Sequence, residues 1–283
     1  MTGPADKPVT SPDDPLSRLR AATQARIGLG RAGHGLPTRA LLDFDLGHAR
    51  ARDAVWTPLD GDAVAAQVGD WPVQTVRSQA HDRAAYLRRP DLGRSLRLSD
   101  AALLPAGPFD LAIVIGDGLS ARAAQAHGAA VALAVRARLA GWTLAPLVLA
   151  HQARVALGDG IGAAMQARIA LVLIGERPGL SAADSLGAYL TYAPRSGRLD
   201  SERNCVSNIR PPHGLGIDQA ADKLVWLLTE ARRIAATGIA LKDQAPSKEQ
   251  AHVHNQPDAA DPGRPLAGPA AAGGDGDGGP FPP

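Results

Sequence analysis

One stretch in the second half of the chain limits the possible folds more than any other. Residues 169–174 form a continuous apolar run, rich in branched side chains, that ends at Gly175. Such a run is typical of a strand buried on both faces, as in a parallel sheet. Pro178 fixes its backbone and Gly179 allows a positive φ, so the chain is expected to turn there.

Glu176 follows this strand directly. Open α/β sheets bind ligands beyond the carboxyl ends of their parallel strands, so Glu176 is predicted to lie at a ligand-facing edge. Ser181, with Asp184 three residues later, has the pattern of a capping box and predicts the start of a helix.

Strands and helices are expected to alternate after residue 100. Apolar runs predict further strands at residues 109–115, 144–150, 188–192 and 205–209. Between and after them, Ser120 is expected to cap a helix, and helical patterns cover residues 129–139, 158–166 and 217–236. This alternation predicts an α/β fold with a mostly parallel sheet.

The first hundred residues have helical patterns instead. Helices are expected at residues 14–28, from Thr38 onward, at 61–68, and at 75–88, where Pro90 closes the last of them. The helix from Thr38 carries many charged side chains, which indicates either a solvated face or a docking surface for a partner chain. Together these segments predict a small helical domain.

Two glycine-rich turns are not nucleotide signatures. Gly28, Gly30 and Gly33 spell G-x-G-x-x-G, but no strand precedes them, so a turn between helices is the better interpretation. The turn at Gly116 and Gly118 precedes a helix and could present backbone N–H groups to a ligand. It lacks the Gly-Lys-Ser/Thr ending of a P-loop.

Composition excludes several classes of protein. Of the 283 residues, 45% are hydrophobic, enough for one or two domains with a core. The 30 basic and 28 acidic residues are well mixed, which argues against nucleic-acid binding. A single cysteine excludes internal disulfides and cysteine-cluster zinc sites. Neither a membrane-spanning run nor a signal peptide is recognisable, so a soluble intracellular protein is expected.

Five short segments together are more specific than a general α/β pattern. They are RIGLGRAG at residues 26–33, GDGLSA at 116–121, RVALGD at 154–159, LIGERPGL at 173–180 and RNCVSNIR at 203–210. In this order they resemble the small subunit of ethanolamine ammonia-lyase, from about Leu19 to Leu241.

The resemblance implies a helical N-terminal domain followed by a Rossmann-like parallel-sheet domain. We therefore expect a helical domain at residues 19–100 and a cobalamin-contacting Rossmann-like domain at residues 101–242. The polar residues 1–18 and the Gly/Pro-rich residues 243–283 are expected to be disordered.

The family splits ethanolamine into acetaldehyde and ammonia with adenosylcobalamin. The resemblance implies that this chain contributes the lower-face and nucleotide-tail side of the cobalamin site. A TIM-barrel large subunit would hold the substrate, in a heterododecamer. The resemblance places the enzyme in a bacterial microcompartment; otherwise we expect a cytoplasmic protein.

By matching motifs, the family's cobalamin contacts fall on Val155, Glu176 and Cys205. Val155 would supply apolar contact, ionised Glu176 would accept hydrogen bonds from amides, and Cys205 would place a small soft group under the ring. The plainer interpretations are a core valine, a surface ion pair of Glu176 with Arg177, and a buried small hydrophobe.

Histidine replaces the cofactor's own base in cobalamin proteins that carry Asp-x-His-x-x-Gly, and this chain lacks that run. The cofactor is therefore expected base-on. Neither a catalytic constellation nor a metal site is recognisable, and the chain is too short to add a TIM barrel of about 250 residues. It is expected to be inactive alone.

Two other functions stay open at this point. A nucleotide-binding oxidoreductase would need an acidic residue at the end of its second strand, where this chain has Ala150 and His151. A non-catalytic assembly module would bind a partner through its helical half and leave the sheet edge empty.

Overall fold

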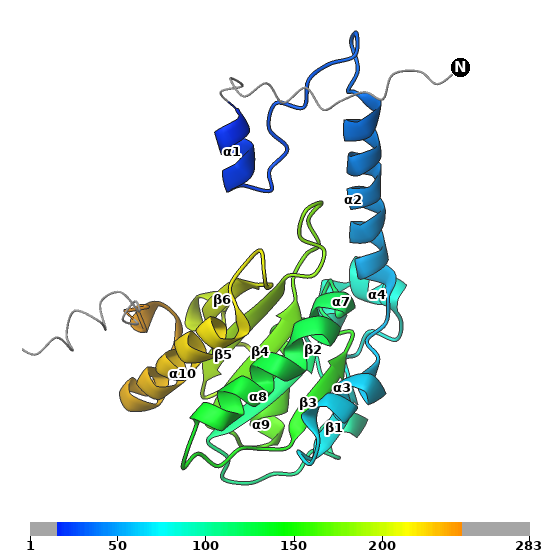
Figure 1. Ribbon diagram of the computed structural model, residues 1–283. Helices are drawn as coiled ribbons and strands as arrows, with labels where there is room; N and C mark the ends of the chain where they lie inside the picture. The colour runs from blue at the N-terminus through cyan, green and yellow to red at the C-terminus, as the bar shows by residue number, and fades with distance from the viewer. Residues whose placement is uncertain (1–15, 245–283) are drawn as a thin grey trace, which may run out of the picture. The chain divides into compact units, whose positions relative to one another are not determined.

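The structure, a computed structural model, describes residues 16–244. Six strands form one sheet in the order β1-β3-β2-β4-β5-β6 (Figure 1). Their bounds are β1 Val73–Arg77, β2 Leu111–Gly116, β3 Leu147–His151, β4 Ile169–Gly175, β5 Leu186–Tyr192 and β6 Asn204–Ile209. The first four strands of this order are parallel, while β5 and β6 are antiparallel additions at one edge.

Helices cover both faces of the sheet. The α-helices are α1 Ser17–Ala22, α2 Thr38–Trp56, α3 Gly61–Val68, α4 Arg83–Arg88, α5 Pro90–Gly93, α6 Leu98–Ala101, α7 Ala121–Ala123, α8 Ala129–Arg138, α9 Leu157–Ala164 and α10 Ile217–Ile234. A π-helical turn, Ala124–Gly128, joins α7 to α8, and short 3₁₀ turns lie at Asp200–Glu202 and Gly238–Ala240. The chain from α7 to α8 is thus one continuous helical stretch rather than the two helices expected.

The core lies on both sides of β2 and β4, whose residues are all buried. Side chains alternate between the faces, as the pleat requires. Leu111, Ile113 and Ile115 pack with α3, α8 and α10, while Ala112 and Val114 pack with α9 on the other face. Figure 1 shows α8 and α10 side by side on the same face. The mostly parallel α/β fold is therefore confirmed.

The helix predicted at residues 75–88 is wrong in its first part. Val73–Arg77 is instead strand β1, paired in parallel with β3. Its β-branched residues favour a strand, and its partner lies about seventy residues further on, where local periodicity gives no signal. The helix begins only at Arg83, after Asp82 caps it. The first hundred residues are therefore not purely helical, and the division near residue 100 stays a prediction.

The helix predicted from Ser181 is also wrong. Residues 176–185 form a loop between β4 and β5. Because these strands are antiparallel, they need no helical crossover. The Ser181 hydroxyl lies 3.4 Å from the carbonyl oxygen of Gln24, in the segment before α2.

The other expected elements are confirmed within a few residues, with one shorter helix. The helix expected at residues 14–28 spans only Ser17–Ala22 among the described residues. The G-x-G-x-x-G stretch is a turn region between α1 and α2, as expected. Most of the N-terminal segment 1–18 and of the tail 243–283 lies outside the described residues.

Candidate functional site

Two of the three predicted contact residues line one cavity. Val155 and Cys205 lie in its wall, and its volume is about 300 Å³. The other lining residues are Arg94, Ala156, Tyr189, Asp200 and Arg203. Residues from the β3–α9 connection, β5 and β6 thus meet at one place, although they are far apart in the sequence.

Val155 forms the apolar side of this cavity. It lies in the turn before α9, where its carbonyl oxygen accepts a 3.1 Å hydrogen bond from the backbone N–H of Gly158. Its side chain is half-buried and packs against the hydrophobic cluster under α9. The side chain is thus shared between the core and the cavity.

Cys205 lies on β6 directly opposite Tyr189 of β5. It is exposed, so the interpretation as a buried small hydrophobe is not supported. Although the residue is exposed, partial burial of its sulfur raises the pKa of the Cys205 thiol. A hydrogen bond from Tyr189 lowers this pKa, and the charge of Glu176 raises it further. The thiol is therefore protonated at neutral pH, which suits contact with a ligand rather than nucleophilic attack.

Glu176 lies directly after β4, at the carboxyl end of the parallel strands as predicted. Its Oε2 accepts a 2.6 Å hydrogen bond from the Ser185 hydroxyl, and the backbone N–H of Asn208 approaches the same oxygen at 3.4 Å. These contacts turn the carboxylate toward the β5–β6 strand pair.

Gly187 connects Glu176 to the cavity. A Cβ added to Gly187 would lie 2.9 Å from Oε1 of Glu176 and 3.0 Å from Cε2 of Tyr189. Glu176 and Tyr189 therefore approach the same backbone position, which only glycine leaves free. Glu176 does not line the cavity itself but lies beside one of its walls.

The sequence did not identify Tyr189, Arg94 or Arg203 as site residues. Tyr189 could have been found from an antiparallel pairing of β5 with β6, since it then faces Cys205. Arg203 stands at the start of a segment that had been singled out, but nothing local indicates its partners. Arg94 follows the short helix α5 and carries no sequence signal.

The glycine turn after β2 is closed by the chain itself. The backbone N–H of Leu119 donates to the carbonyl oxygen of Gly175, and Ser120 caps the following helix. Asp117 is buried and accepts hydrogen bonds of 2.8 and 2.9 Å from the backbone N–H groups of Gln152 and Ala153. The backbone N–H of Leu119, which could otherwise face a ligand, is therefore already engaged.

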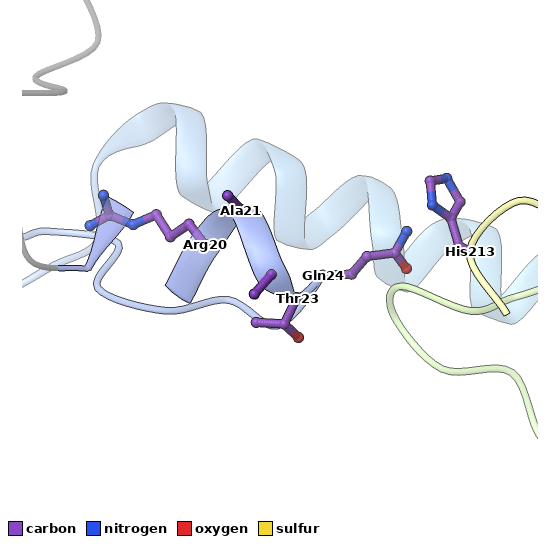
Figure 2. Close-up of a pocket in the computed structure, with 6 residues that line it drawn as sticks. Arg20, Ala21, Thr23, Gln24 and His213 are labelled. Carbon is purple, nitrogen blue, oxygen red and sulfur yellow. The ribbon is translucent and has the colours of Figure 1, made fainter. Parts of the chain in front are cut away.

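A larger hollow of about 580 Å³ lies elsewhere, between the end of α1 and the loop after β6 (Figure 2). Figure 2 shows its lining, with Arg20, Thr23 and Gln24 on one side and His213 on the other. None of the predicted contact residues lies there. We place the candidate site at the smaller cavity because that cavity gathers apolar, thiol, phenol and charged side chains from four separate segments of the chain.

Two further properties of residues 16–244 concern metal binding and membrane crossing. In this range, no three His, Cys, Asp or Glu side chains gather in a way that could hold a metal ion. Within the same range, every helix is too short or too polar to cross a bilayer.

Comparison with known proteins identifies the family. The family model of the ethanolamine ammonia-lyase light chain matches residues 13–242. The ethanolamine ammonia-lyase small subunit of Bradyrhizobium diazoefficiens is 53% identical over 242 residues, covering 83% of this chain and 92% of that protein. The corresponding subunit of Rhodopseudomonas palustris is 54% identical, covering 81% and 90%. That of Xanthomonas campestris is 51% identical, covering 84% and 91%. The chain therefore belongs to the ethanolamine ammonia-lyase light chain family.

Proposed function

We propose that this chain is the small subunit of an adenosylcobalamin-dependent ethanolamine ammonia-lyase, which converts ethanolamine to acetaldehyde and ammonia. It contributes the lower-face and nucleotide-tail side of the cofactor site. The observation that carries the proposal is the meeting of Val155 and Cys205 in one cavity, with Glu176 beside it.

The residues present fit one side of a cobalamin. A corrinoid is a largely apolar disc fringed with amides, so its site needs apolar walls and a few acceptors. Val155 and Ala156 supply apolar surface, and the Tyr189 phenol and the Cys205 thiol supply weakly polar surface. Glu176, held by Ser185, offers carboxylate oxygens to amide N–H groups.

Because Gly187 has no Cβ, there is space beside it for the Glu176 carboxylate. A cavity of about 300 Å³ is at the lower limit for small-ligand sites, so it can hold only part of a corrinoid. The rest of the cofactor must be covered by another surface, which we assign to the large subunit.

When bound, adenosylcobalamin supplies the radical chemistry that ethanolamine cleavage requires, and the protein positions it. This chain's part is to bind and orient. The Cys205 thiol would stay protonated against the cofactor, Glu176 would accept hydrogen bonds from its amides, and Val155 would exclude water from one side. We propose the base-on form of the cofactor because this chain lacks the Asp-x-His-x-x-Gly run.

The exposed apolar side chains of helix α2 are an argument for a large partner chain. The helix has 19 residues, of which only Gly47 and Ala54 are buried. Its exposed large apolar side chains are Leu41, Leu42, Phe44, Leu46 and Trp56. Several large apolar side chains exposed on one helix often mark an interaction site, so we favour the docking interpretation of this helix over plain solvation. We assign the surface to a TIM-barrel large subunit in a heterododecamer, inside a microcompartment or free in the cytoplasm.

Co-expression with the large subunit tests this proposal. Cobalamin absorbance should remain on the purified pair, and ethanolamine turnover should require both chains. A pair that forms but does not retain cobalamin would contradict the proposal. Binding of NAD by this chain alone would instead favour a nucleotide-binding protein.

A further inference from the structure

Two walls of the cavity come from segments with no local connection. Val155 lies in the turn before α9, and Cys205 lies on β6. The width of the cavity therefore depends on whatever holds the start of α9 against the start of β6.

A buried ion pair makes that connection. Nη1 of Arg203 lies 2.6 Å from Oδ1 of Asp159, and Nη2 lies 2.8 Å from Oδ2. Both side chains are only 3% exposed. The contact is bidentate, so it fixes the angle between the two groups as well as their distance.

The ion pair is anchored at both ends. Asp159 is in the first turn of α9, where the helix dipole favours a negative charge, and its N–H donates to the carbonyl oxygen of Ala156 at 3.2 Å. Arg203 directly precedes β6 and also donates to Thr191 Oγ1 of β5 at 2.8 Å. Burial opposes the charge of Arg203, but the hydrogen bonds from its guanidinium to Asp159 hold its pKa above the ordinary value.

The network continues to the rim of the cavity. Oδ1 of Asp200 lies 3.5 Å from Nε of Arg203 and 3.6 Å from a guanidinium nitrogen of Arg94. Arg94 reaches this point from the segment after α5. All three residues line the cavity, and Asp159 supports them from behind.

Stability alone does not account for such a pair. Removing two charges from water costs as much as their attraction returns, so well-packed apolar residues often serve stability equally well. A buried, bidentate pair instead selects one geometry.

We propose that Asp159 and Arg203 are positioning residues that set the distance between the Val155 wall and the Cys205 wall, and thereby the fit of this chain to a corrinoid. The inference rests on the proposed function and goes beyond its three contact residues. Asp159 lies behind the cavity, whereas Arg203 also lines it. Each acts through the segment that it anchors.

The test separates positioning from stability by replacing both partners at once. The double variant Asp159→Leu/Arg203→Met removes the charges together, so no buried charge is left unpaired. It is produced as the full chain with the large subunit and titrated with adenosylcobalamin in the absence of ethanolamine, with bound cofactor read from absorbance. We expect the pair of chains to copurify, the unfolding midpoint to change by no more than about 4 °C, and the Kd for the cofactor to rise by about tenfold or more. In turnover assays, KM for the cofactor should rise more than kcat falls.

Arg138→Met is the matched control. Arg138 joins α8 to Asp218 and Asp222 of α10 on the opposite face of the sheet. This variant should leave the Kd unchanged. A folded, assembled double variant with wild-type Kd would overturn the inference.

Arg203→Lys decides the matter if the double variant fails to fold. This variant keeps the positive charge, but a lysine ammonium cannot form the bidentate contact with Asp159. A folded Arg203→Lys variant with an unchanged Kd for the cofactor would therefore also overturn the inference. A wild-type pair that does not bind adenosylcobalamin would instead contradict the proposed function itself.

Discussion

Ser185 donates a 2.6 Å hydrogen bond from its hydroxyl to Oε2 of Glu176, although the two residues are nine positions apart in the sequence. Because Glu176 follows β4 and Ser185 precedes β5, the bond fixes the carboxylate across the mouth of the β4–β5 loop. The orientation of the predicted acceptor thus depends on a residue that has no recognisable signal in the sequence.

The first prediction removes this bond. In Ser185→Ala, Glu176 keeps its charge but loses its orienting donor, so cobalamin affinity of the assembled enzyme should fall about fivefold, equivalent to about 1 kcal/mol. Titration of the co-expressed pair with adenosylcobalamin measures this. Ser99→Ala, which removes an exposed hydroxyl contact with Asp100, should have no effect. Equal affinities for both variants would contradict the assigned role of Glu176.

The second prediction concerns the space at Gly187. In Gly187→Ala the new methyl group would lie 2.9 Å from Oε1 of Glu176 and 3.0 Å from the Tyr189 ring, so both side chains must shift. The carboxylate is flexible, so the free energy of unfolding should change by less than about 1 kcal/mol, while cofactor affinity falls by about threefold to tenfold. Urea unfolding and cofactor titration distinguish the two effects. Gly216→Ala is the control, because its nearest neighbour would be 3.4 Å away, at the start of α10. If Gly187→Ala lowers the free energy of unfolding but leaves cofactor affinity unchanged, Glu176 and Tyr189 would have no role in cofactor binding.

Much of the sheet was predictable because its strands are apolar on both faces. β2, β3 and β4 were recognised from continuous apolar runs, and Ser120 was recognised as a helix cap. β1 was missed because Val73–Arg77 is a strand only through its pairing with β3. The helix predicted at Ser181 was wrong because a capping-box pattern with Asp184 also occurs in this loop, which joins β4 directly to its antiparallel partner β5.

The candidate site could be predicted only through the family resemblance. The resemblance named Val155, Glu176 and Cys205, and the structure places Val155 and Cys205 in one cavity with Glu176 at its side. The position of Tyr189 in the site depends on strand register, and that of Arg203 depends on its contact with Asp159, 44 positions away in the sequence. No local sequence pattern encodes either one.

The third prediction follows from the raised pKa of the Cys205 thiol. Burial raises this pKa, so less thiolate is present at neutral pH than in a free cysteine, and alkylation by iodoacetamide should be slower. The rate should rise with pH, with a midpoint above that of free cysteine. Mass spectrometry can follow the reaction, because Cys205 is the only cysteine of this chain.

Cobalamin should slow this alkylation further in the assembled enzyme, because the cofactor covers the thiol. Cys205→Ser gives the background rate. A midpoint below that of free cysteine would contradict the environment described here. An unchanged rate in the presence of saturating cobalamin would contradict the placement of the cofactor.

The fourth prediction concerns α2. Leu42 is 61% exposed, so Leu42→Glu should leave the thermal midpoint of this chain unchanged while it places a charge on the docking surface. The yield of large subunit that copurifies should drop severalfold. Ile239→Glu, at an 86% exposed position outside α2, serves as the control for added charge. Full recovery of the large subunit with Leu42→Glu would assign the contact to another surface.

The most direct measurement of the central claim is a cryo-electron microscopy structure of the two co-expressed chains with bound cobalamin. We predict density for the lower side of the corrinoid against Val155, Glu176 and Cys205, with its own base still on cobalt and the large subunit covering the upper face. A corrinoid held wholly within the large subunit, with the Val155–Cys205 cavity facing solvent, would contradict the account.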